Sequence, residues 1–352
     1  MKKTLIALAA VAATGAFAQS SVQIDGVMDA GFQSIDYKGN KVNGFNGNGS
    51  TTSQINFRGV SDLGGGLKAD FRVESDWNTV SNSANTGAKK SDGTLANGAS
   101  FGNGEIRTGL AGGFGKVQFG AINNNTLIAN LTGQPFGTAI GSGHGAVIRS
   151  NSAGTAVRSD NSFQFISPNF SGFDVAYLQA NKQDKANSPN FTSSLGGYQQ
   201  AGVKEASVSY TNGPLAARFT NLKEDNVSTT DTTVNTLGAN YALGAAKVFL
   251  WTQTNKSADG TTRNIAATTV SASYTMGQTV LMAQAGSAKN KLTNKTSNLA
   301  SVGADYNLSK TTALYGRYES IKDEGGVIAA AATIDGTGTT RTRLGLGIRT
   351  AF

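Results

Sequence analysis

The chain of 352 residues has no cysteine, a single histidine and only four prolines. Without cysteine there are no disulfides and no thiol catalysis, and one histidine leaves a zinc site short of its usual ligands. Ser-His catalysis would need that histidine on a strand beside its serine, but His144 lies in a Gly/Ser-rich stretch. Walker A, G-x-S-x-G and G-x-G-x-x-G motifs are also missing. This inventory argues against an enzyme.

Long apolar runs are missing beyond the N-terminus, which excludes a helical membrane protein. The N-terminal stretch has Lys2-Lys3, an apolar run over Leu5–Ala13 and a small-residue cleavage pattern, Ala16-Phe17-Ala18. These features predict a secretory signal peptide over residues 1–18 and a mature domain over 19–352, which leaves the cytoplasm. A buried N-terminal helix is the alternative for this stretch.

The remaining composition is polar, with 45 glycines, 38% apolar residues and a formal net charge of +8. An exported chain of this kind can be disordered, a secreted β-sandwich or a membrane barrel. The lysines and arginines are scattered rather than gathered in patches, so no nucleic-acid partner is expected. Periodicity has to decide among the three classes.

Apolar and polar residues alternate along most of the chain. In Leu67–Asp76 one parity is apolar, and the other carries Lys68, Asp70, Arg72 and Glu74. A strand with this pattern faces lipid on one side and water on the other. Sixteen such segments follow one another, at Val22–Phe32, Thr52–Gly59, Leu67–Asp76, Glu105–Leu110, Lys116–Ala121, Ser162–Ile166, Phe173–Gln179, Ala206–Tyr210, Leu215–Leu222, Thr236–Tyr241, Lys247–Gln253, Thr269–Thr275, Thr279–Ala285, Leu299–Tyr306, Thr312–Ile321 and Arg341–Phe352.

The connections alternate between short turns and long polar loops, which is typical of membrane barrels and has no reason to occur in a β-sandwich. In lipid every backbone group must be paired, so the sheet has to close by pairing Val22–Phe32 with Arg341–Phe352. The sequence therefore predicts an all-β fold, a 16-stranded antiparallel transmembrane β-barrel. Tyr210, Tyr241 and Tyr274, like Tyr306, precede short turns, where an aromatic girdle is expected.

One connection is unusually long. Glu105–Leu110 and Lys116–Ala121 form a hairpin around Gly112-Gly113, and a loop then runs from Ile122 to about Val157. A structureless loop of this length inside a domain argues against the assignment unless the loop is functional. In a wet barrel it can fold inward and narrow the lumen, and this third long loop is therefore the expected constriction.

Six motifs in order give the chain a resemblance to the trimeric general-porin family of Gram-negative outer membranes, of the beta-proteobacterial type. They are Ile24-Asp25-Gly26-Val27-Met28-Asp29-Ala30-Gly31, Gly59-Val60-Ser61-Asp62-Leu63-Gly64-Gly65-Gly66-Leu67-Lys68, Gly109-Leu110-Ala111-Gly112-Gly113-Phe114-Gly115, Arg158-Ser159-Asp160-Asn161-Ser162, Ser167-Pro168-Asn169-Phe170-Ser171-Gly172-Phe173 and Gly303-Ala304-Asp305-Tyr306-Asn307-Leu308-Ser309-Lys310. The terminal Phe352 is similar to the signal by which the family reaches the barrel-assembly machinery.

The resemblance implies a homotrimer in the outer membrane, in contact with its lipid and lipopolysaccharide. It also implies passive diffusion of small hydrophilic solutes, with no cofactor and no metal. By the family pattern Arg58 and Arg158 are basic wall residues, whereas Arg72 is inward by parity alone. The candidates for the pore wall and constriction are Arg58, Arg72, Arg158, Asp25, Asp29, Gln54, Gln164, Lys68 and Arg343, and those on the loop are Asn123, Asn124, Asn125, His144 and Arg149.

Several positions depart from the family pattern. Relatives often carry arginine where this chain has Gln54, Gly104, Ala121 and Gln164, and Arg107 is left with an undecided orientation. The loop from Ile122 to Val157 contains no Asp or Glu, so the acidic half of the usual transverse field is missing there. His144 is expected to be a solvated loop residue.

A basic lumen with low-dielectric walls favours anions, although inward acids such as Asp25 and Asp29 oppose this effect. We therefore expect a mild anion preference. Two alternatives stay open: a secreted adhesin, which would not explain the sorting of loop lengths, and a solute-specific rather than general channel, on which the sequence is silent.

Overall fold

The structure is a computed structural model that describes residues 20–37, 40–77, 79–80, 101–144, 147–148, 157–182, 201–226, 230–323 and 340–352. The expected signal peptide and Arg149 lie outside these ranges. The strands are β1 Ser21–Tyr37, β2 Asn40–Asn46, β3 Gln54–Gly64, β4 Leu67–Asp76, β5 Ile106–Gly112, β6 Gly115–Asn123, β7 Arg158–Ile166, β8 Phe173–Ala180, β9 Gly202–Asn212, β10 Leu215–Asp225, β11 Thr232–Leu243, β12 Ala246–Ser257, β13 Asn264–Met276, β14 Thr279–Asn290, β15 Lys295–Asn307, β16 Thr312–Asp323 and β17 Arg341–Ala351, with helix α2 at Asn125–Thr132. Within the described ranges, no helix has the length and apolar character needed to span a membrane.

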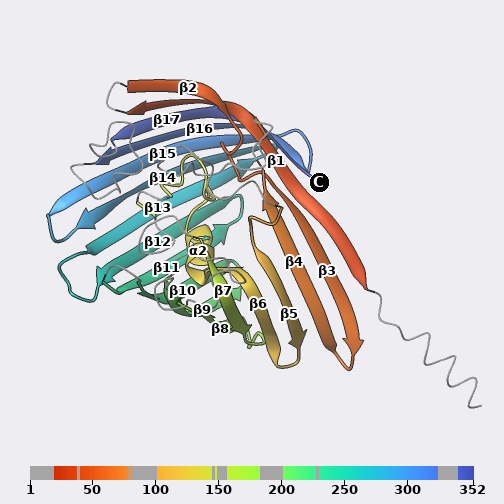
Figure 1. The fold of residues 1–352 in the computed structure, drawn as a ribbon. Helices are drawn as coiled ribbons and strands as arrows, with labels where there is room; N and C mark the ends of the chain where they lie inside the picture. Colours follow the sequence, from red (N-terminus) through yellow and green to blue (C-terminus); the bar gives the residue numbers. More distant parts are fainter. Residues whose placement is uncertain are drawn as a thin grey trace, which may run out of the picture.

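The strands form one antiparallel sheet that closes on itself. The second half of β1 pairs with β17, placing Phe32 opposite Leu346, and the first half pairs with β3. β2, at the top of the view in Figure 1, returns beside the second half of β1, and both β2 and β3 pair with the edge of β1 that does not pair with β17. The fold is a closed 16-stranded antiparallel β-barrel in which β2 is an added segment. The predicted fold and the predicted closure between the first and last strands are confirmed.

Side chains alternate between the two faces of the barrel wall as expected. On β12 the outward Leu250 is exposed, while its neighbour Trp251 is fully buried on the inward side. On β15 the outward Val302 is exposed and the inward Ser301 is buried. An outer face of apolar residues and an inner face rich in polar ones is the pattern of a barrel with lipid outside and water inside.

Tight turns join the strands at one end of the barrel. In three of the two-residue connections a glycine with positive φ comes first and a residue outside that region follows; these glycines are Gly213, Gly244 and Gly277. A type II′ hairpin turn requires that conformation, and glycine adopts it without a steric penalty. The predicted positions of these short turns are confirmed.

At the opposite end the strands run further than the sequence predicted. β14 extends to Asn290 and β15 starts at Lys295, whereas the prediction ended the first strand at Ala285 and began the second at Leu299. β2 was not predicted at all. Apart from Val42, Phe45 and Ala288, these segments carry few apolar side chains, so the apolar alternation stops while the hydrogen-bonded ladder continues beyond the lipid.

The aromatic ring of Tyr315 holds the closing seam together. It projects inward from β16 and fills space left open by Gly31, Gly49 and Gly347, where any Cβ would overlap its phenol group. Its hydroxyl donates a 2.6 Å hydrogen bond to Oδ1 of Asp29 on β1. Tyr315 thereby links β16 across β17 to β1.

We expect Gly347→Val to destabilise the barrel, because the new side chain would displace the Tyr315 ring and leave the buried Asp29 carboxylate without this donor. Loss of such a buried hydrogen bond costs about 1–3 kcal/mol. The measurement is the temperature at which the folded band on an unheated gel converts to the unfolded band. Gly44→Val is the control, since no atom lies within 4 Å of a Cβ at that position. Equal melting of the two variants would contradict the role of Tyr315.

Candidate functional site

Three arginines lie side by side on the inner face of the barrel. The register places Arg58 of β3 opposite Arg72 of β4, and Arg72 opposite Arg107 of β5. Like charges directly opposite each other on a sheet destabilise it unless other groups compensate. The structure therefore has to supply acidic partners next to this row.

Acidic side chains from the same wall pair with each arginine. Arg58 Nε lies 2.9 Å from Asp25, and Arg72 Nη1 lies 2.6 Å from Glu105. Arg72 also pairs with Glu74, and Arg107 pairs with Asp70, which in turn accepts a 2.9 Å hydrogen bond from Lys116. The Arg72–Glu74 pair lies within β4, and the other pairs join neighbouring segments of the wall.

Arg158 of β7 extends this charged wall. Its guanidinium lies 3.5 Å from both Glu74 and Asp76 and donates to the carbonyl oxygen of Asn103. The neighbouring Gln164 is buried and accepts a 2.6 Å hydrogen bond from Gln118. Arg58, Arg72 and Arg158 are thus brought together on one side of the barrel, with Asp25 beside them.

A cavity of about 270 Å³ separates part of this charged wall from helix α2. Its wall side includes Arg107, Lys116 and Arg218, and its helix side includes Asn125 and Ile128. Charged groups of both signs therefore face a polar space across from the helix. Such a space suits the passage of a hydrated solute better than the tight binding of an apolar ligand.

The loop after β6 is held by a carboxylate of the barrel wall. Glu205 of β9 is fully buried and accepts 2.6 Å hydrogen bonds from the backbone N–H groups of Asn125 and Thr126. These are the first amides of α2, and Asn124 at the helix cap makes no capping hydrogen bond with its own side chain. Glu205 supplies the acceptor and the negative charge that a helix N-terminus favours.

A second wall carboxylate holds the far part of the same loop. Glu319 of β16 accepts hydrogen bonds of 3.1 and 3.0 Å from the N–H groups of Gly141 and Gly143. The same carboxylate is paired with Arg343 at 2.7 Å and with Arg341 at 3.3 Å. The loop without acidic residues is therefore anchored by acidic residues of the wall.

Between these anchors, the loop packs against inward-facing side chains. Trp251 of β12 donates a 2.8 Å hydrogen bond to Asn130 of α2, and a Cβ at Gly238 of β11 would collide with the Ala129 carbonyl. Further along the loop, Val147 and Ile148 join a buried cluster with Trp251. The contacts of this segment are with the inner face of the barrel.

Four of the predicted site residues lie outside the cluster of arginines and carboxylates described above. Gln54 is opposite Asp76 in the register, and Lys68 is exposed next to the short turn after β3. Asn123 ends β6 and donates its backbone N–H to Glu105, and Asn124, which caps α2, accepts a hydrogen bond from Ser159.

Two expectations need correction. Asp29 was expected to line the lumen, but it is fully buried, and its carboxylate accepts hydrogen bonds from Ser50 N–H, Thr51 N–H and Tyr315. It therefore fixes the segment after β2 to the closing seam. His144 was expected to be solvated, but it is only partly exposed, because the loop packs against the wall.

Other charged residues of the site were not among the candidates. Arg107 was left undecided, although its parity with Glu105 already indicated the inward face that it occupies. Lys116, Arg218, Glu205 and Glu319 were not proposed either. Glu205 and Glu319 each stand on the polar parity of their strand, which was a usable signal for an inward position but not for contact with a distant loop.

Comparison with known proteins identifies this architecture. The sequence profile described as Gram-negative porin matches residues 4–326. The chain belongs to the Gram-negative porin family. This porin is 31% identical to outer membrane porin protein 32 of Delftia acidovorans, over 100% of both chains. The resemblance noted from the motifs is confirmed, as is the location in the Gram-negative outer membrane.

Solved structures of porins share the fold of this chain. The anion-selective porin from Comamonas acidovorans superimposes with a TM-score of 0.73 at 25% identity, covering 95% of this chain and 100% of that chain. OmpT of Vibrio cholerae in its trimer form has a TM-score of 0.68 at 14% identity, covering 95% of this chain and 99% of that chain, a likeness of fold alone. This porin is therefore a channel protein, and its relatives are channels rather than enzymes.

The burial of His144 gives a pH prediction. Burial and the nearby charge of Arg343 lower the pKa of His144 from 6.5 to about 4. Because the folded state binds the proton less readily than the unfolded state, its stability falls as the pH drops from about 6.5 to about 4. His144 is the only histidine of the chain, so its NMR titration in micelles is unambiguous. A midpoint near 6.5 would show that the ring is solvated.

Proposed function

We propose that this porin forms a water-filled channel for passive diffusion of small hydrophilic solutes and ions, with a mild preference for anions. One observation supports the preference: in most ion pairs of the wall, the basic side chain reaches further into solvent than its acidic partner. The side chain of Arg58 is 44% exposed and that of Asp25 is 24% exposed. For Arg158 and Glu74 the values are 24% and 6%.

The physical reason is side-chain length. The acids lie close to the backbone, and the longer arginine side chains extend past them toward the water. A passing ion meets guanidinium groups before carboxylates, and low-dielectric walls focus their field. Two pairs of the wall are exceptions: Arg218 and Asp174, at 18% and 25%, and Arg317 and Asp305, at 4% and 12%. These exceptions limit the preference. The solved relative from Comamonas acidovorans is itself described as anion-selective.

We also propose that residues 122–157, the third long loop, narrow this channel. The proposal is supported by the two wall carboxylates that hold the loop and by the cavity between α2 and the charged wall. On this view Asn125 and the wall arginines line the passage, and His144 lies in the anchored part of the loop. The remaining candidates, Gln54, Gln164, Lys68 and Arg343, contribute polar or basic groups to the lumen.

We also propose how the protein assembles in the membrane. A homotrimer is supported by the family and by the trimer form solved for OmpT. Recognition by the barrel-assembly machinery through Phe352 is supported by the position of this residue, whose backbone makes two 3.0 Å hydrogen bonds with Gly26 at the seam. Contact with outer-membrane lipid and lipopolysaccharide follows from the apolar outer face. We further propose that residues 1–18 are removed on export.

The preference is tested by reversal potentials across a planar bilayer with a salt gradient. We expect an anion-to-cation permeability ratio above one, and Arg58→Gln should lower it by about twofold, because a screened charge a few ångströms from the path biases ion entry modestly. Lys291→Gln, in the turn between β14 and β15, removes the same charge outside the lumen and should leave the ratio unchanged. Cation preference of the unmodified channel would refute the proposal.

The role of the loop is tested by Glu205→Gln, which removes the negative charge and one accepting oxygen from the α2 anchor. We expect noisier single-channel currents and a larger mean conductance, because weakening these buried hydrogen bonds by about 1–3 kcal/mol frees the loop. Asp62→Asn removes one negative charge near a short turn and keeps an acceptor for the Gly64 N–H. Identical recordings from the two variants would mean that the loop does not set the conductance.

A further inference from the structure

The connection between β2 and β3 contains more chain than the sheet can use. On the edge of β1 that faces away from β17, pairing with β2 ends where Gly31 is opposite Asn46, and pairing with β3 begins where Val27 is opposite Gln54. Three positions of β1 separate these two pairs, whereas seven residues, 47–53, connect the strands. A strand that runs beside another uses about one residue for each position that it passes. The surplus chain therefore has to leave the sheet, and we name residues 47–53 the strap.

The strap lies against the inner face of the barrel wall. Asp29 of β1 shares the parity of Asp25, which pairs with Arg58 on the inner face. The Asp29 carboxylate accepts hydrogen bonds of 2.7 and 2.8 Å from the backbone N–H groups of Ser50 and Thr51. Because Asp29 points inward and is nevertheless fully buried, the strap covers it from the side of the lumen.

Further hydrogen bonds fix the strap to this wall. The Ser53 hydroxyl accepts a 2.9 Å hydrogen bond from the backbone N–H of Asp29 and lies 2.8 Å from the carbonyl oxygen of Gly47, so it joins the two ends of the strap. In the middle, the Ser50 hydroxyl accepts a 3.2 Å hydrogen bond from Arg317 of β16, which is itself buried. The strap is therefore held on both sides of the closing seam.

The strap and the third long loop meet on the inner wall. Ile140 of the loop donates its backbone N–H to the carbonyl oxygen of Gly49 at 3.3 Å, and its side chain packs on Gly345 of β17. Helix α2 contacts β9 to β12, the loop around Ile140 contacts β17, and the strap contacts β1. Beyond the strap, Arg58 of β3 keeps 44% of its side chain exposed. The open passage therefore runs between these inward segments and the arginines of the wall.

The chemistry of the strap differs from that of the wall. Its sequence, Gly47-Asn48-Gly49-Ser50-Thr51-Thr52-Ser53, contains no charged residue. Four of its polar residues are partly exposed, and because the strap lies inside the barrel this exposure is to the lumen; they are Asn48, Ser50, Thr51 and Thr52. Hydroxyl and amide groups both donate and accept hydrogen bonds, so they can replace water around a solute without attracting ions of one sign.

We propose that the strap is a second internal narrowing of the channel, which presents hydroxyl groups to a passing solute opposite the arginines of the wall. The inference rests on the proposed channel and extends it, since the third loop is then one of two inward segments that set the width of the passage. A hydrated solute meets fixed cations on one side and neutral hydrogen-bonding groups on the other.

The test uses single cysteines, because the unmodified chain has none. Thr51→Cys places a thiol on the strap and keeps its anchor, which uses the backbone N–H of Thr51. Thr52→Cys is a second variant, for use if the first does not fold. The folded protein in a planar bilayer is treated with a methanethiosulfonate that carries either a sulfonate or a trimethylammonium group. Each reagent forms a disulfide with the thiol and releases methanesulfinate.

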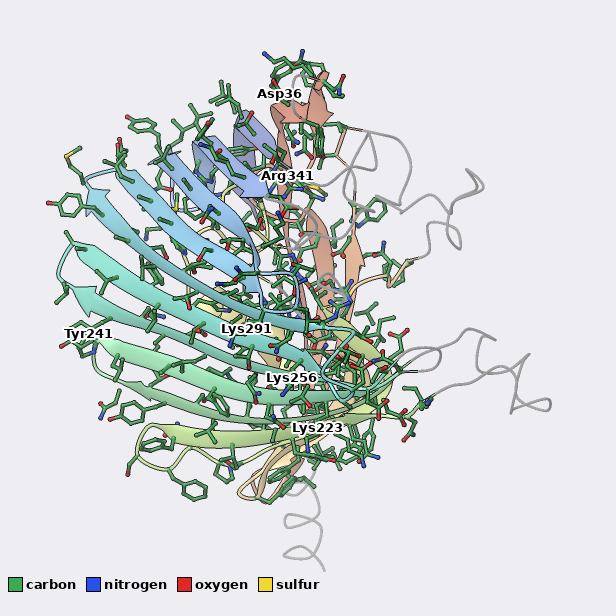
Figure 2. All side chains as sticks on the ribbon, turned by 90° about the vertical axis from the view of Figure 1, so that its left-hand side faces the viewer. Asp36, Lys223, Tyr241, Lys256, Lys291 and Arg341 are labelled. Atoms are coloured by element: carbon green, nitrogen blue, oxygen red, sulfur yellow. The ribbon has the colours of Figure 1, made fainter. Side chains whose placement is uncertain are left out.

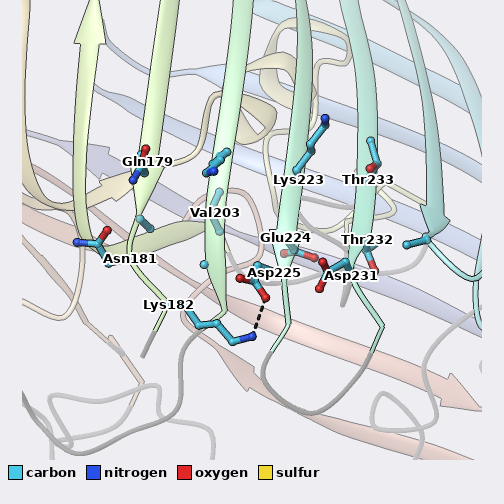
Figure 3. A pocket seen from close by; sticks show the side chains of 14 residues that line it. Gln179, Asn181, Lys182, Val203, Lys223, Glu224, Asp225, Asp231, Thr232 and Thr233 are labelled. Carbon is cyan, nitrogen blue, oxygen red and sulfur yellow. Dashed lines mark hydrogen bonds and ion pairs between the residues drawn. The ribbon is translucent and has the colours of Figure 1, made fainter. Parts of the chain in front are cut away.

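Thr233→Cys is the matched control, because the same substitution is made outside the lumen. Thr233 of β11 shares the outward parity of Tyr241 and is opposite Lys223 in the register. Figure 2 shows Tyr241 near one end of the barrel and Lys223 toward the other. Thr233 lines a pocket of about 500 Å³ at the ends of β8 to β11 (Figure 3), so the reagents can reach a thiol at this position.

We expect modification of Thr51→Cys to lower the single-channel conductance by roughly a quarter with either reagent, because the added group occupies the passage. The sulfonate should lower the anion-to-cation permeability ratio about twofold and the trimethylammonium group should raise it about twofold, since a screened charge beside the path biases ion entry modestly. Displacement of the third loop would instead move the ratio in the same direction with both reagents. Modified Thr233→Cys should keep the conductance and the ratio of the unmodified channel.

Three results would overturn the proposal: full modification of the strap thiol with unchanged conductance, a strap thiol that reacts only after unfolding, or an equal response of the control. Mass spectrometry of the protein recovered after treatment establishes the extent of modification. None of these results touches the proposed channel, which depends on the conductance of the unmodified protein. An unmodified protein without conductance would defeat the channel, while the reactivity of the thiol in the folded protein would still show whether the strap faces water.

Discussion

Backbone hydrogen bonding in lipid is the constraint on which this structure depends. No water is available in the hydrocarbon layer, so every N–H and C=O must be paired within the protein, and a sheet can satisfy this only by closing. Closure brings β1 against β17, at residues more than 300 positions apart in the chain. The Tyr315 ring packs against the glycines on both sides of that seam. Asp29 is buried there because the ring hydroxyl and two loop amides donate hydrogen bonds to its carboxylate.

Closure also explains which parts of the fold the sequence could predict. Where a strand faces lipid and water, alternation is enforced, and segments such as Leu67–Asp76 were located to the residue. Beyond the lipid both faces meet water, so β2 and the extended hairpin of β14 and β15 carried no regular apolar alternation to detect. Hydrogen bonding alone keeps those segments paired, and it leaves little trace in the pattern of side chains.

For the site, the sequence predicted which side chains face inward but not which of them are buried. Parity placed Arg58 and Arg72 on the inner face, and the structure pairs both with acids of adjacent strands. Burial was not predictable, because it depends on which loop covers a position: Asp29 is enclosed by the seam and His144 is packed against the wall. The contacts of Glu205 and Glu319 with the loop join residues about 80 and 178 positions apart, a separation that no local pattern can reveal.

The distribution of charge reconciles two demands on the wall. A row of three opposed arginines would repel itself, and carboxylates of the same wall offset this repulsion by pairing with each of them. Complete neutralisation would leave no field in the lumen, but opposite charges at different depths do not cancel at the water surface. In most of these pairs the basic side chain is more exposed than its partner, so pairing stabilises the wall and still leaves basic groups at its water surface. Loop acids are unnecessary in this arrangement, since the wall supplies both the counter-charges and the anchors of the loop.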